Sequence, residues 1–362
     1  MKVPKKLVFA AFLLLICLLI HYYGLDQLRV ENGYSTQFSP RFTRFLRSML
    51  GRIPFSIGDF IYGGLIIWVI WSLVKFIRTI VRKGAVLSRK TYLLLSAYKL
   101  FVFCSMIYII FNLFWGLNYD RKGIAWQLNL PMDKYSEQDL KDVNNLLVQK
   151  INLSKSVLLK NATSYPSNRQ LYSEVERSYK KLAGEYSFLR YDPASLKTSM
   201  WGWLGNYTGF TGYYNPFTGE AQVNTMVPAF LQPFIACHEV AHQLGYAKEM
   251  EANFVGYLAA RTSTDTLFHY SVYLDLFTYA NRTLYLLDST NAKMYRKQLD
   301  TAVVLDIRAW AEFNRKHRSP VEPVIAWIYG NFLKSNQQPQ GLLSYDEVTA
   351  FLISYYKKFG KI

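Results

Sequence analysis

The stretch CHEVAHQLGYAKEMEANF, residues 237–254, decides how the chain around it folds. His238 and His242 are four residues apart, so on a helix they lie one above the other on the same face. Glu239 is one residue further round. The pattern HExxH is the short motif of zinc sites in which the glutamate takes a proton from zinc-activated water. The spacing therefore predicts a helix with His238 and His242 as metal ligands and Glu239 as a general base.

A catalytic zinc site needs a third protein ligand and an open position. Gly245 follows the second histidine by three residues, where it can end the helix in the left-handed conformation. A second helical pattern follows, and it carries Glu249 and Asn253 on one face. Gly256 continues that face with a small residue, so the second helix can approach the first closely. We expect Glu249 to be the third ligand, with Asn253 hydrogen bonded to a ligand histidine.

Two alternatives remain open at this point. Glu251 lies on another face of the second helix and could be the third ligand instead of Glu249. Cys237 adjoins the first histidine, but its side chain points about 100° further round the helix, so we expect a packed core thiol. The other two cysteines, Cys17 and Cys104, lie in apolar runs and form no CxxC pair. An odd, scattered set of cysteines argues against a disulfide framework.

The composition of the 362-residue chain indicates a membrane component. Hydrophobic residues make up 51% and aromatic residues 17% of it, both unusual for a wholly soluble protein. The net charge is +17, and residues 1–120 hold 15 basic against 4 acidic side chains. A basic excess concentrated around apolar runs indicates membrane topology rather than nucleic-acid binding. We therefore expect the lipid bilayer as a partner and no nucleic acid.

Three apolar segments are long enough to cross a membrane, at residues 7–24, 57–77 and 93–115. The first has the basic flank of a signal peptide, but no small-x-small cleavage site follows it, so we expect an uncleaved anchor. Trp115 ends the third segment, where an interfacial aromatic residue is expected. We predict a membrane module with three transmembrane helices at residues 1–119, followed by a separate domain at residues 120–362.

The basic residues near the spans predict the orientation. Two basic segments are expected to face the cytoplasm: they contain Lys2, Lys5 and Lys6, and Arg78, Arg82, Lys83, Arg89 and Lys90. Residues 25–54 also hold five arginines, but over a longer stretch. We expect a multi-pass protein of the bacterial inner (cytoplasmic) membrane whose C-terminal domain is periplasmic or extracellular. A buried core helix in place of the second span would invert that placement.

Residues 120–362 have the patterns of a mainly α, α+β domain. Ser136 opens a capping signature for one helix, and a second amphipathic helix begins at Asn168. The cluster NPFTG predicts a β-hairpin that joins short strands at 212–214 and 221–224. After residue 227 helices dominate. We predict them at 233–244, 248–262, 266–288, 294–316, 321–335 and 344–358.

HEVAH followed by EMEAN resembles the zincin superfamily, and especially the gluzincin-type peptidases, in which a glutamate of the next helix is the third ligand. The resemblance implies a zincin-like domain with one zinc ion per chain. Carried onto this sequence, it makes His238, His242 and Glu249 the ligands, Glu239 the base and Asn253 a supporting residue. The HExxHxxGxxH variant would need a ligand at Lys248, which cannot serve while protonated.

Over nearly its full length the chain resembles a bacterial family known as domain of unknown function 3810. The matching stretches are FWGLNYDR at 114–121, TGYYNPFTGEAQVN at 211–224, the motif region itself, and GLLSYDEV at 341–348. In zincins an edge strand near the active-site helix binds the substrate backbone, and the hairpin could supply that strand. Tyr213, Tyr214 and Tyr345 are candidates for binding substrate and stabilising an oxyanion, and each is also a plausible packing residue.

Together these patterns predict a membrane-anchored, zinc-dependent metallopeptidase that hydrolyses polypeptides. Two other classes compete with it. One is a non-catalytic module that retains a zinc-binding zincin scaffold, which the intact Glu239 disfavours. The other is a membrane transport or assembly protein in which HEVAH is a coincidence. A path of charges through the spans would favour the last class, but only Asp59 and Lys99 lie in or near them.

Overall fold

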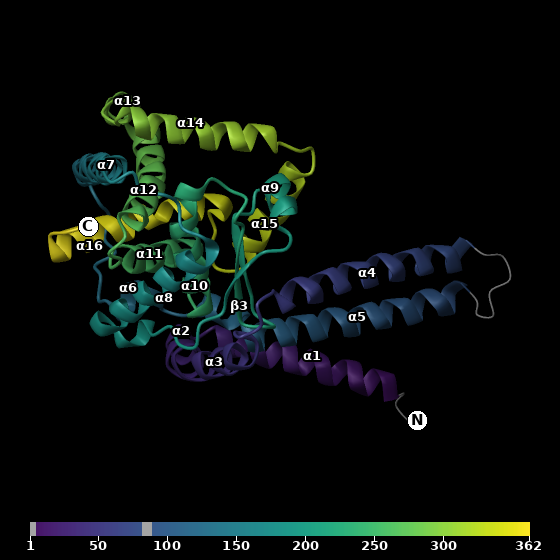
Figure 1. Cartoon of the computed structure of the whole chain (residues 1–362). Coiled ribbons are helices and arrows are strands. Elements are labelled where there is room, and N and C mark those ends of the chain that lie inside the picture. The colour runs from purple at the N-terminus through teal and green to yellow at the C-terminus, as the bar shows by residue number, and fades with distance from the viewer. Residues whose placement is uncertain (1–4, 82–88) are drawn as a thin grey trace.

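The computed structural model of the chain describes residues 5–81 and 89–362. Three long apolar helices project from one side of a mainly helical body that contains a small sheet (Figure 1). They are α1 (Lys5–Gly24), α4 (Ile57–Val81) and α5 (Arg89–Phe114). Their most apolar stretches are almost entirely uncovered by protein. Three candidate membrane-spanning helices indicate a membrane protein.

The positions of the three predicted spans are confirmed. No part of the apolar window of α4 is buried, so the alternative of a buried core helix at this position is wrong. α4 and α5 lie side by side and lead the chain out from the body and back to it (Figure 1). Lys2, Arg82 and Lys83, on which part of the predicted orientation depends, lie outside the described residues.

The chain between α1 and α4 packs against the body. It forms α2 (Gln27–Arg29), a π-helical turn η1 (Val30–Phe38) and α3 (Ser39–Leu50). Glu31 of η1 is fully buried, and its two carboxylate oxygens accept hydrogen bonds from Arg121 at 2.7 and 2.9 Å. These contacts cross the predicted division between residues 119 and 120. They place residues 25–56 on the same side of the membrane as the body.

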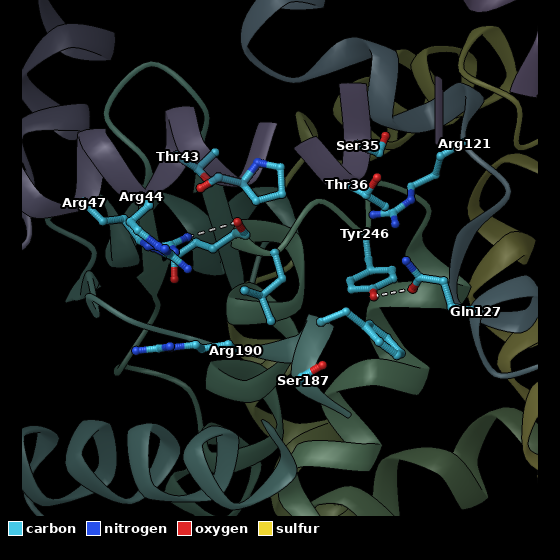
Figure 2. Close-up of a pocket in the computed structure, with 14 residues that line it drawn as sticks. Ser35, Thr36, Thr43, Arg44, Arg47, Arg121, Gln127, Ser187, Arg190 and Tyr246 are labelled. Atoms are coloured by element: carbon cyan, nitrogen blue, oxygen red, sulfur yellow. Dashed lines mark hydrogen bonds between the residues drawn. The ribbon is translucent and has the colours of Figure 1, made fainter. Parts of the chain in front are cut away.

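A polar cavity of about 210 Å³ lies where α3 meets the body, and we call it the arginine cavity (Figure 2). Its wall includes Arg44 and Arg47 of α3, together with Arg121, Arg190 and Tyr246 of the body.

Helices make up most of the body, as predicted. The α-helices are α6 (Gly123–Gln127), α7 (Glu137–Lys160), α8 (Asn168–Glu185), α9 (Gly202–Thr208), α10 (Gln232–Gln243), α11 (Glu249–Ala260), α12 (Thr266–Leu287), α13 (Ser289–Lys297), α14 (Thr301–Lys316), α15 (Glu322–Ser335) and α16 (Val348–Phe359). The 3-10 turns are η2 (Gly116–Asp120), η3 (Ser187–Leu189), η4 (Ala229–Leu231) and η5 (Gly341–Glu347). The capping box at Ser136 is present, with Asp139 as its partner.

The single helix predicted at 294–316 is wrong: two helices, α13 and α14, occupy this region. Asn152 of α7 satisfies the backbone groups at the break. Its Nδ2 donates to the carbonyl of Gln298 at 2.8 Å, and its Oδ1 accepts from the amide of Asp300 at 3.0 Å. A side chain distant in sequence thus provides the bonds that a continuous helix would make for itself.

The sheet has three strands in the order β1-β3-β2. β2 (Gly212–Asn215) and β3 (Glu220–Val223) form the predicted antiparallel hairpin. β1 (Leu196–Thr198) pairs in parallel with β3 and was not predicted, because three residues give too short a pattern. β2 is an edge strand of the sheet. Glu220 of β3 accepts hydrogen bonds from the amides of Ile57 and Gly58, which ties the first turn of α4 to the sheet.

α10 and α11 lie at the centre of the hydrophobic core. Residues 251–260 of α11 are all buried, which is the pattern of a helix surrounded by protein on every side. Helices α8, α12 and α16 surround α11, and β2 and β3 contact α10 on the side of the sheet. The two motif helices are therefore held by the most tightly packed part of the body.

Candidate metal centre

The sequence between the two motif helices turns as predicted. α10 carries both histidines and ends one residue after His242, and Gly245 has a φ of +91°, the left-handed conformation that favours glycine. α11 then begins at Glu249. A Cβ atom added to Gly256 would lie 3.1 Å from the backbone nitrogen of His238. The small residue therefore allows the close helix approach on which the predicted ligand set depends.

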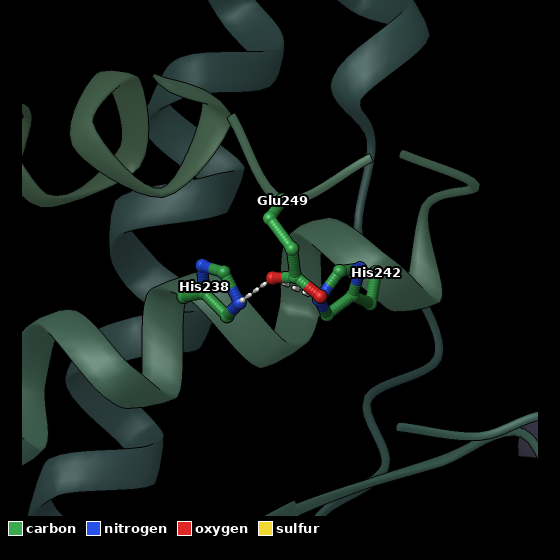
Figure 3. Close-up of side chains that lie close together, drawn as sticks. All are labelled: His238, His242 and Glu249. Carbon is green, nitrogen blue, oxygen red and sulfur yellow. Dashed lines mark ion pairs between the residues drawn. The ribbon is translucent and has the colours of Figure 1, made fainter. Parts of the chain in front are cut away.

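His238, His242 and Glu249 come together in the structure (Figure 3). Oε2 of Glu249 lies 3.3 Å from Nε2 of His238 and 3.5 Å from Nε2 of His242. A charge-assisted hydrogen bond between nitrogen and carboxylate is shorter, about 2.7–2.9 Å. In a tetrahedral zinc site each ligand atom lies about 2.0–2.1 Å from the ion. Two such ligand atoms are then about 3.3–3.4 Å from each other. The spacing of the three atoms therefore fits a shared zinc ion better than direct hydrogen bonds.

The hydrogen bond of His242 directs one of its nitrogens at the cluster. Nδ1 lies 2.7 Å from the carbonyl oxygen of Tyr246, and because a carbonyl only accepts, Nδ1 carries the proton. The lone pair of Nε2 is then free to bind a cation. Burial lowers the pKa of His238, and Glu249 and, to a smaller extent, Asn253 oppose this effect without reversing it. No hydrogen bond reaches Nδ1 of His238 from the described residues.

Hydrogen bonds hold both the side chain and the backbone of Glu249 in place. The hydroxyl of Tyr329 donates to Oε1 at 2.6 Å, and the backbone amide of Glu249 donates to the side chain of Gln338 at 2.9 Å. Oε2, the atom that faces the imidazoles, has no hydrogen-bond partner among the described residues. Tyr329 was not predicted, and no spacing in its sequence relates it to the motif 80 residues earlier.

The charges within the cluster attract a cation. Burial disfavours the charged form of His242, but Glu249 and then Glu239 outweigh it and raise the pKa of His242 to about 9. Burial raises the pKa of Glu249, but His242 and His238 overcome that effect and hold this pKa well below its usual range. The field that attracts a proton between these groups would attract a divalent ion in the same way.

Glu239 lies beside the cluster and against the sheet. Its side chain is buried, and a Cβ atom on Gly212 of β2 would lie 2.5 Å from its Oε1. Oε2 of Glu239 has no partner among the described residues. Burial raises the pKa of Glu239 to about 8, close to the neutral range in which a general acid or base works best.

Glu251, the alternative ligand, points the other way. It is as buried as Glu249, at 3% exposed, but its carboxylate lies against Gly123, where a Cβ atom would be 1.8 Å from Oε1. Position 123 also has a φ of +80°. The left-handed backbone and the lack of space for a Cβ atom both favour glycine there. Burial raises the pKa of Glu251, and Lys248 and Arg121 lower it in part. The structure thus brings Glu249 and not Glu251 to the two imidazoles. Cys237 is a fully buried core residue, as predicted.

The three predicted tyrosines lie in different places. The hydroxyl of Tyr213 donates to Asp59 of α4. Tyr214 is partly buried, its hydroxyl is unpaired among the described residues, and its ring lies 4.6 Å from that of Trp115. Tyr345 lies beside Tyr329 and near enough to Glu249 for that carboxylate to help burial raise its pKa.

The prediction that Trp115 lies at the membrane interface is wrong. Trp115 is buried, and its ring packs edge-on against the imidazole of His242 at 6.0 Å. The end of α5 therefore reaches into the body and forms a wall of the candidate metal centre. A tryptophan at the end of an apolar run has the sequence pattern of an interfacial residue, and only the tertiary packing distinguishes the two.

The cluster opens into a cleft of about 680 Å³, within the range of about 300–1,000 Å³ that is usual for ligand sites. β2, α10, α12 and α15 all contribute to its lining. The lining includes Glu239 and the residues from Thr208 to Tyr214 that lead into and form the edge strand. An extended ligand in this cleft would run alongside an exposed strand edge and past the cluster.

Comparison with known proteins identifies the family. The family described as "Protein of unknown function (DUF3810)" matches residues 34–353, and the chain belongs to it. No curated protein and no solved structure matches the chain. The match includes the end of η1, all of α3, and the candidate spans α4 and α5 as well as the candidate metal centre.

Proposed function

We propose that this chain is a membrane-anchored, zinc-dependent metallopeptidase of zincin-like fold. The observation that carries the proposal is the spacing of 3.3 and 3.5 Å between Oε2 of Glu249 and the two Nε2 atoms. His238, His242 and Glu249 would hold one zinc ion. When bound, zinc supplies positive charge that makes a nearby water more acidic and polarises a carbonyl group.

Each side chain around the cluster has a role in this proposal. Glu239 accepts the proton of the attacking water through its unpaired Oε2 and passes it to the leaving amine. Tyr329 holds the carboxylate of Glu249 in place, and Asn253 supports His238. The hydroxyl of Tyr345 is the group best placed to donate to the oxyanion of the intermediate.

The geometry of the cleft favours a polypeptide as substrate. β2 is an edge strand, and its free side can pair with an extended peptide by strand addition. Gly212 lies directly against Glu239, so a peptide paired there is brought close to the base. The substrate class is membrane-proximal protein or wall-associated peptide, since the cleft belongs to a body held at the membrane by three spans.

We place the protein in the bacterial cytoplasmic membrane with residues 120–362 on the periplasmic or extracellular side. The basic residues around the first span and in the connection between the second and third support this orientation. Asn161→Cys, in an exposed turn after α7, should react with a membrane-impermeant maleimide in intact cells. Labelling of this cysteine only after lysis would contradict the orientation.

Metal content and hydrolysis test the function itself. The purified full chain should contain one zinc ion, and His242→Ala should lose it. Glu239→Gln should keep the zinc and lose the hydrolysis of a peptide library. Zinc without hydrolysis in the unsubstituted chain would favour the non-catalytic alternative, and hydrolysis by Glu239→Gln would overturn the mechanism. The full chain is required because Glu31 and Ile57, which precede residue 120, bond to the body.

A further inference from the structure

The arginine cavity is a second polar cavity, distinct from the cleft. Four arginines line it, and none of its lining residues within the described chain is acidic. Figure 2 shows them at two ends, with Arg44, Arg47 and Arg190 at one and Arg121 at the other. The two ends differ in whether their charge is compensated.

The Arg121 end is compensated by the protein. Glu31 pairs with this guanidinium through both oxygens, and the amide of Gly123 and the side chain of Gln127 bond to the same carboxylate. Burial raises the pKa of Glu31, but Arg121 outweighs it and holds the value below the usual range. Charge at this end needs no further partner.

The other end is not compensated. Arg47 is 3% exposed, and among the described residues its guanidinium donates to the backbone carbonyls of Pro193 and Gln243, at 2.8 and 3.2 Å. It also lies over the ring of Tyr191, 5.5 Å from the ring centre, which carries no net charge. No carboxylate of the described residues pairs with Arg47. Arg44 lies beside it without an ion pair in the described chain, and Arg190 pairs only with the exposed Asp192. Leaving a buried guanidinium without an anion is costly, so this arrangement indicates an anion from outside the chain.

A buried hydroxyl in the same cavity also lacks a partner. Ser35 is 2% exposed, and its Oγ makes no hydrogen bond to any described residue. Buried hydroxyl groups are nearly always hydrogen bonded, so an unpaired one that lines a cavity indicates a ligand or water there. Ser35 lies toward the Arg121 end (Figure 2), so a ligand that reached from the three arginines to Ser35 would extend along the cavity.

The size and position of the cavity suit a small charged headgroup. Its volume of about 210 Å³ is below the range of about 300–1,000 Å³ typical of drug-sized ligands. α3 lies in the segment that joins two membrane-spanning helices, and it exposes Phe45 and Met49 at 57% and 60%. Exposed apolar side chains next to two spans place this segment in the membrane surface, at the level of lipid headgroups.

We propose that the arginine cavity binds a phosphate group, carried either by an anionic phospholipid or by a soluble phosphate ester. Arg44, Arg47 and Arg190 bind the phosphate oxygens, because the planar fork of a guanidinium matches them with two parallel hydrogen bonds. The hydroxyl of Ser35 donates to the ester portion of the ligand.

Calorimetric titration of inorganic phosphate into the full chain in a neutral detergent tests the shared chemistry. Arg44→Gln and Arg190→Gln should each weaken phosphate binding about tenfold, because each removes a charge-assisted contact. Both side chains are exposed, so these variants are expected to fold. Arg41→Gln is the matched control, because Arg41 is an exposed arginine of α3 that does not line the cavity. It should leave the binding within about twofold of the unsubstituted chain.

Nanodiscs distinguish the two sources of the phosphate. The chain is reconstituted in phosphatidylcholine with or without phosphatidylglycerol, and the retained lipid is measured by native mass spectrometry. Retention of phosphatidylglycerol that is lost in the Arg44→Gln/Arg190→Gln double variant assigns the cavity to a lipid. Phosphate binding that needs these arginines, without such retention, assigns it to a soluble ester. Absence of both effects, or equal effects of Arg41→Gln, would overturn the proposal.

Discussion

The cleft and the arginine cavity meet at the end of α10 and differ in their charged groups: carboxylates and imidazoles line the cleft, and arginines line the cavity. His242 lines the cleft, and the next residue, Gln243, lines the arginine cavity. In the cleft, buried carboxylates face two imidazoles at distances that suit a cation between them. In the arginine cavity, the partners of the buried Arg47 guanidinium among the described residues are backbone carbonyls and the ring of Tyr191, with no carboxylate paired to it. In each case the charge that the protein leaves uncompensated indicates the sign of the ligand.

The turn that follows α10 connects the two sites. Arg47 donates to the carbonyl of Gln243, and Arg121 donates to that of Gly245 at 3.0 Å. His242, on the other side of the same turn, bonds to the carbonyl of Tyr246. The carbonyl groups after the helix end are thus shared between arginines on one side and an imidazole of the candidate metal centre on the other. Four predictions test this comparison.

The largest effect is expected on stability, at the end of the arginine cavity where Glu31 neutralises the charge of Arg121. Glu31→Gln leaves the buried Arg121 without its anion and should reduce the free energy of unfolding by about 3–5 kcal/mol. Thermal denaturation of the full chain in detergent measures it. The double variant Glu31→Gln/Arg121→Met should recover most of the loss, because it removes the unpaired charge as well. A Glu31→Gln protein as stable as the unsubstituted chain would show that this end of the cavity does not depend on compensation.

The next effect concerns the edge strand in the cleft. Gly212→Ala places a Cβ atom 2.5 Å from Oε1 of Glu239, so the carboxylate must shift. A displacement of about 1 Å at a catalytic group costs about a hundredfold in rate, and we expect peptide hydrolysis to fall by that factor with zinc content unchanged. Gly184→Ala is the control, since a Cβ atom there meets nothing within 4 Å. Equal activity of the two variants would contradict the placement of Glu239.

A smaller effect is expected from the hydroxyl that holds the third ligand. Tyr329→Phe removes the hydrogen bond to Oε1 of Glu249 and should weaken zinc binding about tenfold. Competition with a chromogenic chelator measures the affinity. Tyr285→Phe, at an exposed tyrosine of α12, should leave it unchanged. If the two variants bound zinc equally well, the hydrogen bond from Tyr329 to Glu249 would not contribute to zinc affinity.

The last effect is a pH dependence of stability from Asp275 in the lining of the cleft. Burial raises its pKa to about 7, against the lowering effects of Tyr279 and Arg282. The folded state therefore holds a proton that the unfolded state releases near pH 4, and stability falls as the pH rises from about 4 to 7. Asp275→Asn should remove this loss, so that the variant gains stability over the unsubstituted chain at pH 8 but not at pH 4. Melting temperatures at the two pH values measure it, and equal shifts at both would contradict it.

Local patterns in the sequence predicted much of the fold. The left-handed Gly245, the capping box at Ser136 and the β2–β3 hairpin each depend on residues within a few positions of one another, and the structure has all three. The convergence of Glu249 on the imidazoles was also predictable in geometry, because the spacing of Glu249, Asn253 and Gly256 specifies one helix face. Its role as a metal ligand stays a prediction.

What could not be predicted depends on contacts between distant residues. Tyr329 reaches Glu249 across 80 positions, and Asn152 reaches Gln298 across 146. Neither partner carries a local signal, because a tyrosine on an apolar helix and an asparagine on an amphipathic one are ordinary residues. Trp115 ends an apolar run, a pattern that predicted the membrane interface, but it is buried in the body. The arginine cavity was missed for a similar reason, since arginines near a membrane span are first explained by topology.

The pair formed by Glu31 and Arg121 also constrains the order of events during biosynthesis. The two residues are 90 positions apart, and α4 and α5 lie between them. At about 5–20 residues per second, the ribosome adds that length in roughly 5–18 s. Until then the carboxylate has no guanidinium to receive it. The pair that joins η1 to the body therefore forms only after both hydrophobic helices have been synthesised.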